Sequence, residues 1–274
     1  MILKTLVENT SISEDYGSEH GLSLYIETRR HKLLFDTGAS GLFAKNAIKM
    51  GVDLPGVDLA VISHGHYDHG GGLKTFLSVN SKASVYLNQR AFGMHYANRP
   101  NVGKGYIGLD AGLLPSDRFV FVGEDLVIDE ELRLFSHVRG GKFNPAGNRD
   151  LFMVAGEGIV PDDFEHEQNL VITEDENTVL LAGCAHKGIV NILEYLAAVK
   201  GIEPGIVIGG FHLYNRVADE SEDPGMVMKI GAALLEHKAK YYTCHCTGME
   251  SYKRLKSIMG ERLEYLATGS EIKI

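Results

Sequence analysis

The sequence Ser63-His64-Gly65-His66-Tyr67-Asp68-His69-Gly70-Gly71 decides the fold. Four of its side chains can bind a metal: His64, His66, Asp68 and His69. Alternate residues of an extended chain point to the same side, so His64 and His66 can share one ion. Asp68 and His69 lie on the following turn and can reach a second ion. Imidazole and carboxylate ligands suit Zn, Mn or Fe(II), so the pattern predicts one or two divalent transition metals, with Zn as the first choice.

A short apolar run, Asp58-Leu-Ala-Val-Ile-Ser63, leads directly into this motif. A continuous apolar run of this length is typical of a strand that is buried on both faces of a sheet. Short strands and helices alternate along most of the chain, which predicts an α/β fold with helices covering the sheets. We expect further strands at 22–27, 32–36, 170–173, 179–182, 205–209 and 240–243, and helices at 42–50, 188–199, 225–238 and 249–259.

Composition narrows the class of protein. The 274 residues, which we expect to form a single domain (1–274), carry 27 Lys and Arg against 36 Asp and Glu. Such an acidic chain argues against general binding to nucleic acids or anionic membranes. Its apolar runs are far shorter than the ~20 residues of a membrane span, and no leader segment is visible. Three cysteines are too few for a disulfide framework, so we expect a cytoplasmic protein.

Residues 88–165 are the least regular part of the chain. Residues 98–101 and 103–108 have a loop-like composition, and short strands are expected at 119–122 and 132–135. We interpret this segment as an inserted α+β unit that covers the site and selects a small-molecule substrate. Some of its residues either bind a phosphate group of that substrate or only solvate a loop: Arg90, Arg99, Lys104 and Tyr106. The sequence does not decide between a monomer and a homo-oligomer.

The motif His64-x-His66-x-Asp68-His69, placed after an apolar strand, resembles the signature of the metallo-β-lactamase superfamily. Asp36, in Leu34-Phe-Asp-Thr-Gly38, resembles that superfamily's first motif. The resemblance implies an αββα sandwich with one or two metals between the loops at one edge. Four further segments are similar to the family of 7,8-dihydropterin-6-yl-methyl-4-(β-D-ribofuranosyl)aminobenzene 5′-phosphate synthases: Glu19-His-Gly-Leu-Ser-Leu24, Gly183-Cys-Ala-His-Lys-Gly-Ile-Val-Asn191, Gly209-Gly-Phe-His-Leu213 and His245-Cys-Thr-Gly248.

The resemblance also implies the remaining metal ligands. The last histidine of the superfamily pattern corresponds to His245, and the bridging aspartate corresponds to Cys184. A thiolate is a softer ligand than a carboxylate, so this difference bears on the second metal site. Two residues are candidates for the third histidine of the first site. His186, directly at a strand end, is favoured over His166, which has the superfamily's usual spacing. Asp36 is expected to orient a metal-bound histidine rather than to bind metal.

His212 ends the predicted strand 205–209. Its placement is similar to that in the superfamily's tRNA 3′-end-processing ribonucleases, where the analogous histidine assists catalysis beside the metals. We therefore expect His212 to act as a general acid or to hydrogen-bond the transition state, with metal binding and core packing as alternatives. Together with Asp36 and Asp68, it forms the expected catalytic set. The other residues near the motifs have simpler expectations: core packing for Cys244 and Cys246, and a loop hydrogen bond or a substrate contact for His20.

Four functions are compatible with this site. The first is a metal-dependent hydrolase, because a bound metal lowers the pKa of water to about 7 and so activates it against an ester, phosphodiester or cyclic phosphate. The second, implied by the resemblance, is the dihydropterin-linked synthase reaction. The third is a di-iron redox enzyme, but the superfamily's oxygen reductases have Glu where this chain has His66, which favours hydrolysis. The fourth, a metal-binding protein without turnover, would leave His212 without a role.

Overall fold

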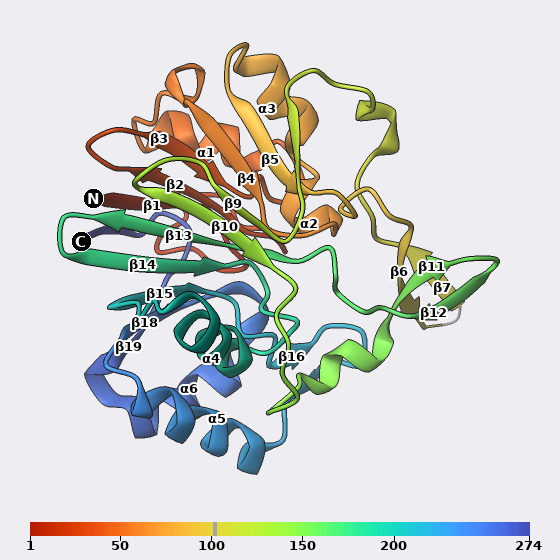
Figure 1. Ribbon diagram of the computed structural model, residues 1–274, viewed down its shortest axis with the longest axis vertical. Coiled ribbons are helices and arrows are strands. Elements are labelled where there is room, and N and C mark those ends of the chain that lie inside the picture. Colours follow the sequence, from red (N-terminus) through yellow and green to blue (C-terminus); the bar gives the residue numbers. More distant parts are fainter. Residues whose placement is uncertain (101–102) are drawn as a thin grey trace.

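The computed structural model describes residues 1–100 and 103–274. Two seven-stranded sheets lie face to face, with helices on both outer sides (Figure 1). In spatial order, the first sheet contains β20 (Glu271–Lys273), β1 (Ile2–Val7), β2 (Ser23–Glu27), β3 (Lys32–Phe35), β4 (Leu59–Ile62), β5 (Ser84–Asn88) and β8 (Phe119–Val122). The second contains β19 (Leu263–Tyr265), β18 (Lys240–Thr243), β15 (Ile206–Gly209), β14 (Asn177–Ala182), β13 (Gln168–Glu174), β10 (Leu132–Ser136) and β9 (Asp125–Val127).

Strand β4 shows how the sequence produces these layers. Successive side chains of a strand face opposite sides of the sheet. Leu59 and Val61 therefore pack into the core between the two sheets, whereas Ala60 and Ile62 pack beneath the outer helices. The helices on this side are α1 (Leu42–Lys49) and α3 (Leu73–Val79), and the short α2 (Tyr67–Gly70) precedes α3. The run is apolar throughout because both of its faces are buried.

The second sheet repeats this pattern. In β14, Val179 and Leu181 face the first sheet, and Leu180 and Ala182 face the helices on the other side. Those helices are α4 (Ile189–Lys200), α5 (Pro224–Glu236) and α6 (Met249–Met259). Three apolar cores thus separate four layers, and the predicted αββα sandwich is confirmed.

The parallel strands of both sheets bring their loops to one edge. β3, β4, β5 and β8 are parallel neighbours in the first sheet, and β14, β15, β18 and β19 are parallel in the second. Ala182 pairs with Gly209, and Gly209 pairs with Thr243, so three consecutive strands end level with one another. Loops that follow parallel strands meet at the carboxyl edge of a sheet, where ligands bind in α/β proteins.

The expected insertion at 88–165 divides into two parts. A four-stranded sheet projects from the sandwich (Figure 1) and contains β12 (Gly158–Pro161), β11 (Leu151–Ala155), β6 (His95–Arg99) and β7 (Gly103–Tyr106). The stretch that contains β8, β9 and β10 instead belongs to the two main sheets, because its apolar side chains, such as Leu132 and Leu134, are buried in the core between them. The loops expected at 98–101 and 103–108 are largely the β6–β7 hairpin, and residues 101–102 lie outside the described residues.

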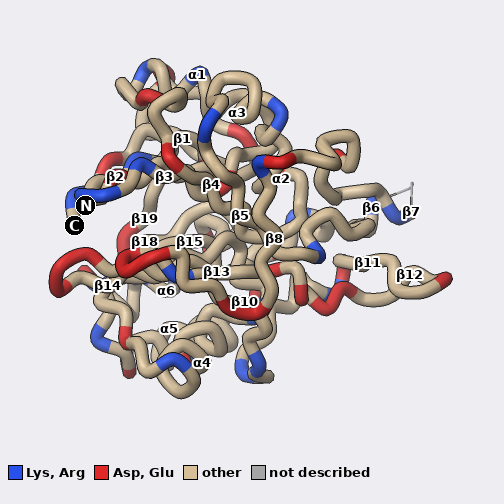
Figure 2. The backbone as a smooth tube through the Cα atoms, turned by 45° about the horizontal axis from the view of Figure 1, so that its top comes forward, with Lys and Arg blue, Asp and Glu red and all other residues tan. Residues whose placement is uncertain are grey.

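Acidic and basic residues are both distributed along the chain around the two sheets (Figure 2). A small hairpin, β16 (Tyr214–Asn215) with β17 (Glu220–Ser221), completes the strands. Within residues 1–100 and 103–274, none of the helices combines the length and hydropathy that crossing a membrane requires.

Candidate metal centre

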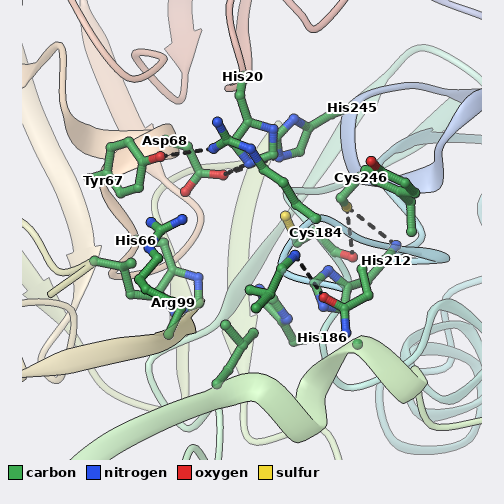
Figure 3. A pocket seen from close by; sticks show the side chains of 18 residues that line it. His20, His66, Tyr67, Asp68, Arg99, Cys184, His186, His212, His245 and Cys246 are labelled. Atoms are coloured by element: carbon green, nitrogen blue, oxygen red, sulfur yellow. Dashed lines mark hydrogen bonds and ion pairs between the residues drawn. The ribbon is translucent and has the colours of Figure 1, made fainter. Parts of the chain in front are cut away.

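The side chains expected to bind metal lie together at the carboxyl edge of the strands. The segment after β4, which includes the short helix α2, supplies four of them. The segment after β14 supplies two, and the segment after β18 supplies one. All seven are buried: His64, His66, Asp68, His69, Cys184, His186 and His245. In Figure 3, Asp68 and His245 lie on one side of Cys184, and His186 lies on the other. The fold therefore gathers residues from both sheets into one site.

Backbone geometry at the strand ends helps to aim these side chains. Asp36, Ala185, His212 and His245 have φ angles of 61°, 53°, 51° and 52°, in the left-handed region that non-glycine residues rarely adopt. Each follows a strand by one to three residues. Such conformations cost about 1–3 kcal/mol each and cluster at functional sites. These strained residues thus lie where the backbone turns at the strand ends, beside the candidate site.

His64, His66 and His186 form the first ligand group, with one potential ligand atom of each lying within 4.8 Å of the others. Nδ1 of His64 lies 2.9 Å from Ser63 Oγ, and Nδ1 of His186 lies 3.0 Å from Asn148 Oδ1. Their Nε2 atoms are buried and have no hydrogen-bond partner among the described residues. Burial and the neighbouring imidazoles lower the pKa of His64 and His186 well below the usual value. Both are therefore neutral, which is the form that binds metal.

His166 has a different environment. Its Nδ1 accepts a hydrogen bond from the backbone N–H of Gly65 at 2.9 Å, and its Nε2 lies 3.3 Å from Asp162 Oδ2. Burial lowers the pKa of His166 to about 3. It belongs to a buried group with His66, His95 and Asp162, whereas His186 is grouped with both His64 and His66. The geometry thus favours His186 as the third histidine of the first site.

Asp68, His69 and His245 form the second ligand group. His245 Nε2 lies 3.3 Å from His69 Nε2 and 3.4 Å from Asp68 Oδ2, and His69 Nε2 lies 3.8 Å from that same carboxylate oxygen. Ligand atoms of a tetrahedral ion with bonds of about 2.1 Å are about 3.4 Å apart. Burial alone raises the pKa of Asp68, but contacts with His69, His20 and His245 outweigh burial and hold it well below its usual range. The group thus offers a carboxylate and two imidazoles.

Cys184 lies between the two groups. Its Sγ is 3.2 Å from His69 Nε2, and it is within ligand distance of residues from both halves of the site, including His64, His186 and His245. This is the position expected of a bridging ligand. Burial raises the pKa of the Cys184 thiol, so a metal would have to displace its proton.

His212 lies on the rim of the first group. Its ring centroid is 4.2 Å from that of His186, and both of its ring nitrogens are buried without a hydrogen-bond partner in the described part of the chain. Its backbone N–H donates to Cys246 Sγ at 3.3 Å. Cys246 therefore lines the pocket as well as being buried, which differs from the expected core packing, whereas Cys244 does pack in the core between the sheets.

The pocket outside the two groups carries further polar side chains. His20 Nε2 lies 3.1 Å from Asp68 Oδ2 (Figure 3). Arg216 donates to the hydroxyl of Tyr67 at 3.1 Å. Of the four phosphate-binding candidates, Arg99 lines this pocket. The other three have contacts elsewhere: Arg90 with Asp163, Lys104 over the ring of Phe152, and Tyr106 with the carbonyl of Leu109.

Several residues that orient the ligands were not identified from the sequence. Asn9 Oδ1 lies 2.8 Å from His245 Nδ1, and Asn148 Oδ1 holds His186. The buried carboxylate of Glu167 accepts hydrogen bonds from the backbone N–H groups of His186 at 2.6 Å and Lys187 at 3.1 Å. None belongs to a local sequence motif, so only the tertiary structure reveals them.

The donor set fits a divalent transition metal. Imidazole nitrogens, a carboxylate and a thiolate are the ligands that such ions take in proteins. The buried Nε2 atoms of His64 and His186 support this fit, because a buried polar atom without a partner is costly unless it binds something.

Comparison with known proteins agrees with the fold. The profile of the Metallo-beta-lactamase superfamily matches residues 16–221. The structure is similar to the crystal structure of Tm1679, described as a metal-dependent hydrolase of the β-lactamase superfamily, with a TM-score of 0.82 and 32% identity over 100% of this chain and 99% of that one.

Two curated proteins of Methanocaldococcus jannaschii are also similar. An uncharacterized protein, MJ0448, is 28% identical over 94% of both chains. A 7,8-dihydropterin-6-methyl-4-(beta-D-ribofuranosyl)-aminobenzene-5'-phosphate synthase is 26% identical over 96% of this chain and 95% of its own length. The chain belongs to the metallo-β-lactamase superfamily of metal-dependent enzymes.

Proposed function

We propose that the chain is a hydrolase with a two-metal centre that cleaves an ester, phosphodiester or cyclic phosphate bond in a small molecule. The observation that carries the proposal is the position of Cys184, which lies within ligand distance of His64 and His186 and also of His69 and His245. Zinc is the proposed metal, because a thiolate with several imidazoles suits it better than it suits Mn.

A metal bound at such a site supplies an activated water at neutral pH and polarises the bond to be cleaved. The chain's own residues would hold and orient the substrate. His212, with two buried ring nitrogens on the pocket side of His186, is placed to give a proton to the leaving group. His20, 3.1 Å from Asp68, would help to fix that carboxylate.

The rim of the pocket favours a substrate with a phosphate group. Arg216 is exposed and held by the Tyr67 hydroxyl, next to the ligand Asp68, and Arg99 lines the same pocket. Guanidinium groups bind phosphate oxygens in pairs of hydrogen bonds. We expect Arg216→Ala to raise KM for a phosphodiester more than for an uncharged lactone. Arg254→Ala, on helix α6 with its own partner Glu250, is the control.

The synthase reaction is a second candidate. It is supported by the relative with that name, which is 26% identical over 96% of this chain.

The three cysteines of the chain are free and buried, which suits a protein of the reducing cytoplasm under both candidate functions.

Metal analysis combined with a substrate panel tests the proposal. Protein purified without chelators should contain about one or two equivalents of Zn per chain and should hydrolyse at least one phosphodiester, phosphomonoester or lactone. His186→Ala should lose both metal and turnover, whereas His237→Ala, at the end of α5, should lose neither. Only trace amounts of all transition metals in the wild-type protein would contradict the proposal. Full metal loading without hydrolysis of any ester would favour the synthase.

A further inference from the structure

We infer that Glu8 is a positioning residue for the second half of the metal centre. Its carboxylate holds the backbone of His245 where the imidazole can share one ion with Asp68 and His69. Glu8 directly follows β1 of the first sheet, whereas His245 follows β18 of the second sheet. The inference rests on the proposed two-metal centre, but Glu8 is not one of the proposed ligands.

The carboxylate of Glu8 is buried and accepts hydrogen bonds on both oxygens. Its Oε1 accepts the backbone N–H of His245 at 2.8 Å and the hydroxyl of Tyr265 at 2.5 Å. Its Oε2 accepts the backbone N–H of Thr10 at 2.8 Å and the hydroxyl of the same residue at 2.7 Å. Four hydrogen bonds thus compensate the burial of this carboxylate.

Two further residues fix the position of Glu8 itself. Burial and the neighbouring Glu8 carboxylate raise the pKa of Tyr265, so its hydroxyl keeps its proton and donates to Glu8. The backbone N–H of Glu8 donates to Thr268 Oγ1 at 2.7 Å. Tyr265 belongs to β19, and Thr268 lies between β19 and β20. The carboxylate is therefore held in one place by groups other than His245.

Glu8 and its neighbour Asn9 together contact three polar groups of His245. Glu8 accepts the backbone N–H, Asn9 Nδ2 donates to the carbonyl at 3.4 Å, and Asn9 Oδ1 lies 2.8 Å from Nδ1 of the ring. His245 has a φ of 52°, and such a conformation persists only where the surrounding structure enforces it. The end of β1 therefore sets the direction in which the remaining nitrogen, Nε2, points.

Glu8 also links the two halves of the second ligand group. Asp68 and His69 follow β4 in the first sheet, whereas His245 comes from the second sheet. Residues of a binding site must lie within about 0.5 Å of their productive positions. The hydrogen bond from His245 to Glu8 joins the two sheets at this edge, so it fixes His245 relative to the other two ligands. Its loss should weaken the ion of the second ligand group and spare that of the first.

Hydrogen exchange in the metal-free chain tests the contact without any metal. Glu8→Met keeps the length of the side chain but removes both acceptor oxygens. NMR should find the backbone N–H of His245 exchanging about 10–100-fold faster in this variant, whereas that of Leu180, in the core of β14, keeps its rate. Glu27→Met is the matched control, because Glu27 accepts a hydrogen bond from Tyr25 at the other end of the first sheet.

Zinc affinity, measured by competition with a chelator, tests the consequence for the metal centre. His245→Ala and His186→Ala identify the ions of the second and first ligand groups. In Glu8→Met the ion that His245→Ala loses should bind about 10–100-fold more weakly, and the ion that His186→Ala loses should keep its affinity. Glu27→Met should leave both affinities unchanged. A residue with only a general structural role would weaken both ions together.

The outcomes separate this inference from the proposed function. Unchanged exchange at His245 in Glu8→Met, equal acceleration at His245 and Leu180, or equal weakening of both ions would overturn the inference and leave the metal centre untouched. Absence of zinc binding by the wild-type chain would count against the proposed function, and the exchange result alone would then decide the inference.

A milder variant decides the matter if Glu8→Met does not fold. Tyr265→Phe removes one of the hydroxyl groups that anchor Glu8 and should accelerate exchange at His245 by about fivefold. Tyr25→Phe, which removes the corresponding hydroxyl from Glu27, should have no effect at His245. Equal exchange rates at His245 in these two variants would contradict the inference.

Discussion

Oδ2 of Asp36 lies 2.6 Å from Nδ1 of His69, and both side chains are completely buried. The same carboxylate accepts hydrogen bonds from the backbone N–H and the hydroxyl of Ser63, each at 2.7 Å. Burial on its own lowers the pKa of His69, but the carboxylates of Asp36 and Asp68 outweigh it and raise the pKa to about 9. Asp36 therefore connects the end of β3 to the segment 63–69, which follows β4. It orients His69 without facing the metal centre itself.

Replacement of Asp36 by Asn should destabilise the metal-free protein. The variant keeps the shape of the side chain but leaves the buried His69 without its charged partner. Breaking a buried charged pair typically costs about 3–5 kcal/mol of the free energy of unfolding. Urea denaturation at neutral pH measures the loss. Asp125→Asn, which breaks an exposed pair with Arg133, should cost under about 1 kcal/mol. Equal effects of the two changes would show that Asp36 has no special structural role.

Replacement of Cys184 by Asp should change metal preference. It puts a hard carboxylate where the superfamily pattern has one, between the two ligand groups. Hard oxygen ligands favour Mn relative to Zn. The ratio of Zn to Mn affinity should fall by about tenfold or more, as is typical of changes around a metal. Cys184→Ser, with neither thiolate nor carboxylate, should weaken binding of both ions. An unchanged ratio in Cys184→Asp would mean that Cys184 does not touch the metal.

Glu167 should make stability depend on pH. Burial raises the pKa of its carboxyl from 4.5 to about 7, although the N–H groups of His186 and Lys187 lower it. At Glu167 the folded chain thus binds a proton that the unfolded chain has lost between these two values, so the contribution of Glu167 to stability falls as pH rises through this window. One such proton changes the free energy of unfolding by about 1.4 kcal/mol per pH unit.

Urea denaturation of chelator-treated protein at several pH values measures this slope. Glu167→Gln cannot ionise, so the free energy of unfolding of this variant should have a more positive slope against pH than that of the wild-type chain over the same window. Glu176→Gln, in the exposed turn between β13 and β14, should keep the wild-type slope. A Glu167→Gln slope equal to that of the wild-type chain would show that Glu167 is already ionised in the folded protein at low pH.

Strong local patterns made most of the sandwich predictable. The expected strand at 240–243 and helix at 249–259 coincide with β18 and α6. The small sheet was harder to predict, because Gly103 and Gly105 weaken the strand pattern of β7 and favour a loop. Pairing with β6 forms this pair of strands in spite of the composition. Residues 98–101 also have a loop-like composition, so no partner strand for β7 was expected.

The residues of the site also fall into those that a local motif predicts and those that only the tertiary structure reveals. His64, His66, Asp68 and His69 form one local motif, so their shared location follows from the sequence. The residues that orient the ligands come from distant segments: Asn9 from just after β1, and Asn148 from the short 3₁₀ helix Ala146–Asp150. A single Asn or Asp in a loop has many possible roles. Its function becomes visible only when tertiary structure brings it to a ring nitrogen.

His212 should contribute to turnover without holding the metal. His212→Ala removes two buried ring nitrogens beside His186. If His212 gives a proton to the leaving group, the variant should keep its metal and lose about 10²–10⁴-fold in turnover, equivalent to about 3–5 kcal/mol of barrier. Metal content, melting temperature and turnover, all measured on one preparation, distinguish this role from the alternatives.

Each alternative role of His212 gives a different combination of these three results. A metal ligand would lose metal and turnover together in His212→Ala. A histidine that only packs would lower the melting temperature, while the folded fraction kept its specific activity. The left-handed backbone at His212, with φ of 51°, favours a functional role, because a packing residue gains nothing from that strain. Full turnover with full metal content in His212→Ala would refute the assignment, and the proton donor would then have to be sought elsewhere on the pocket rim, beginning with His20.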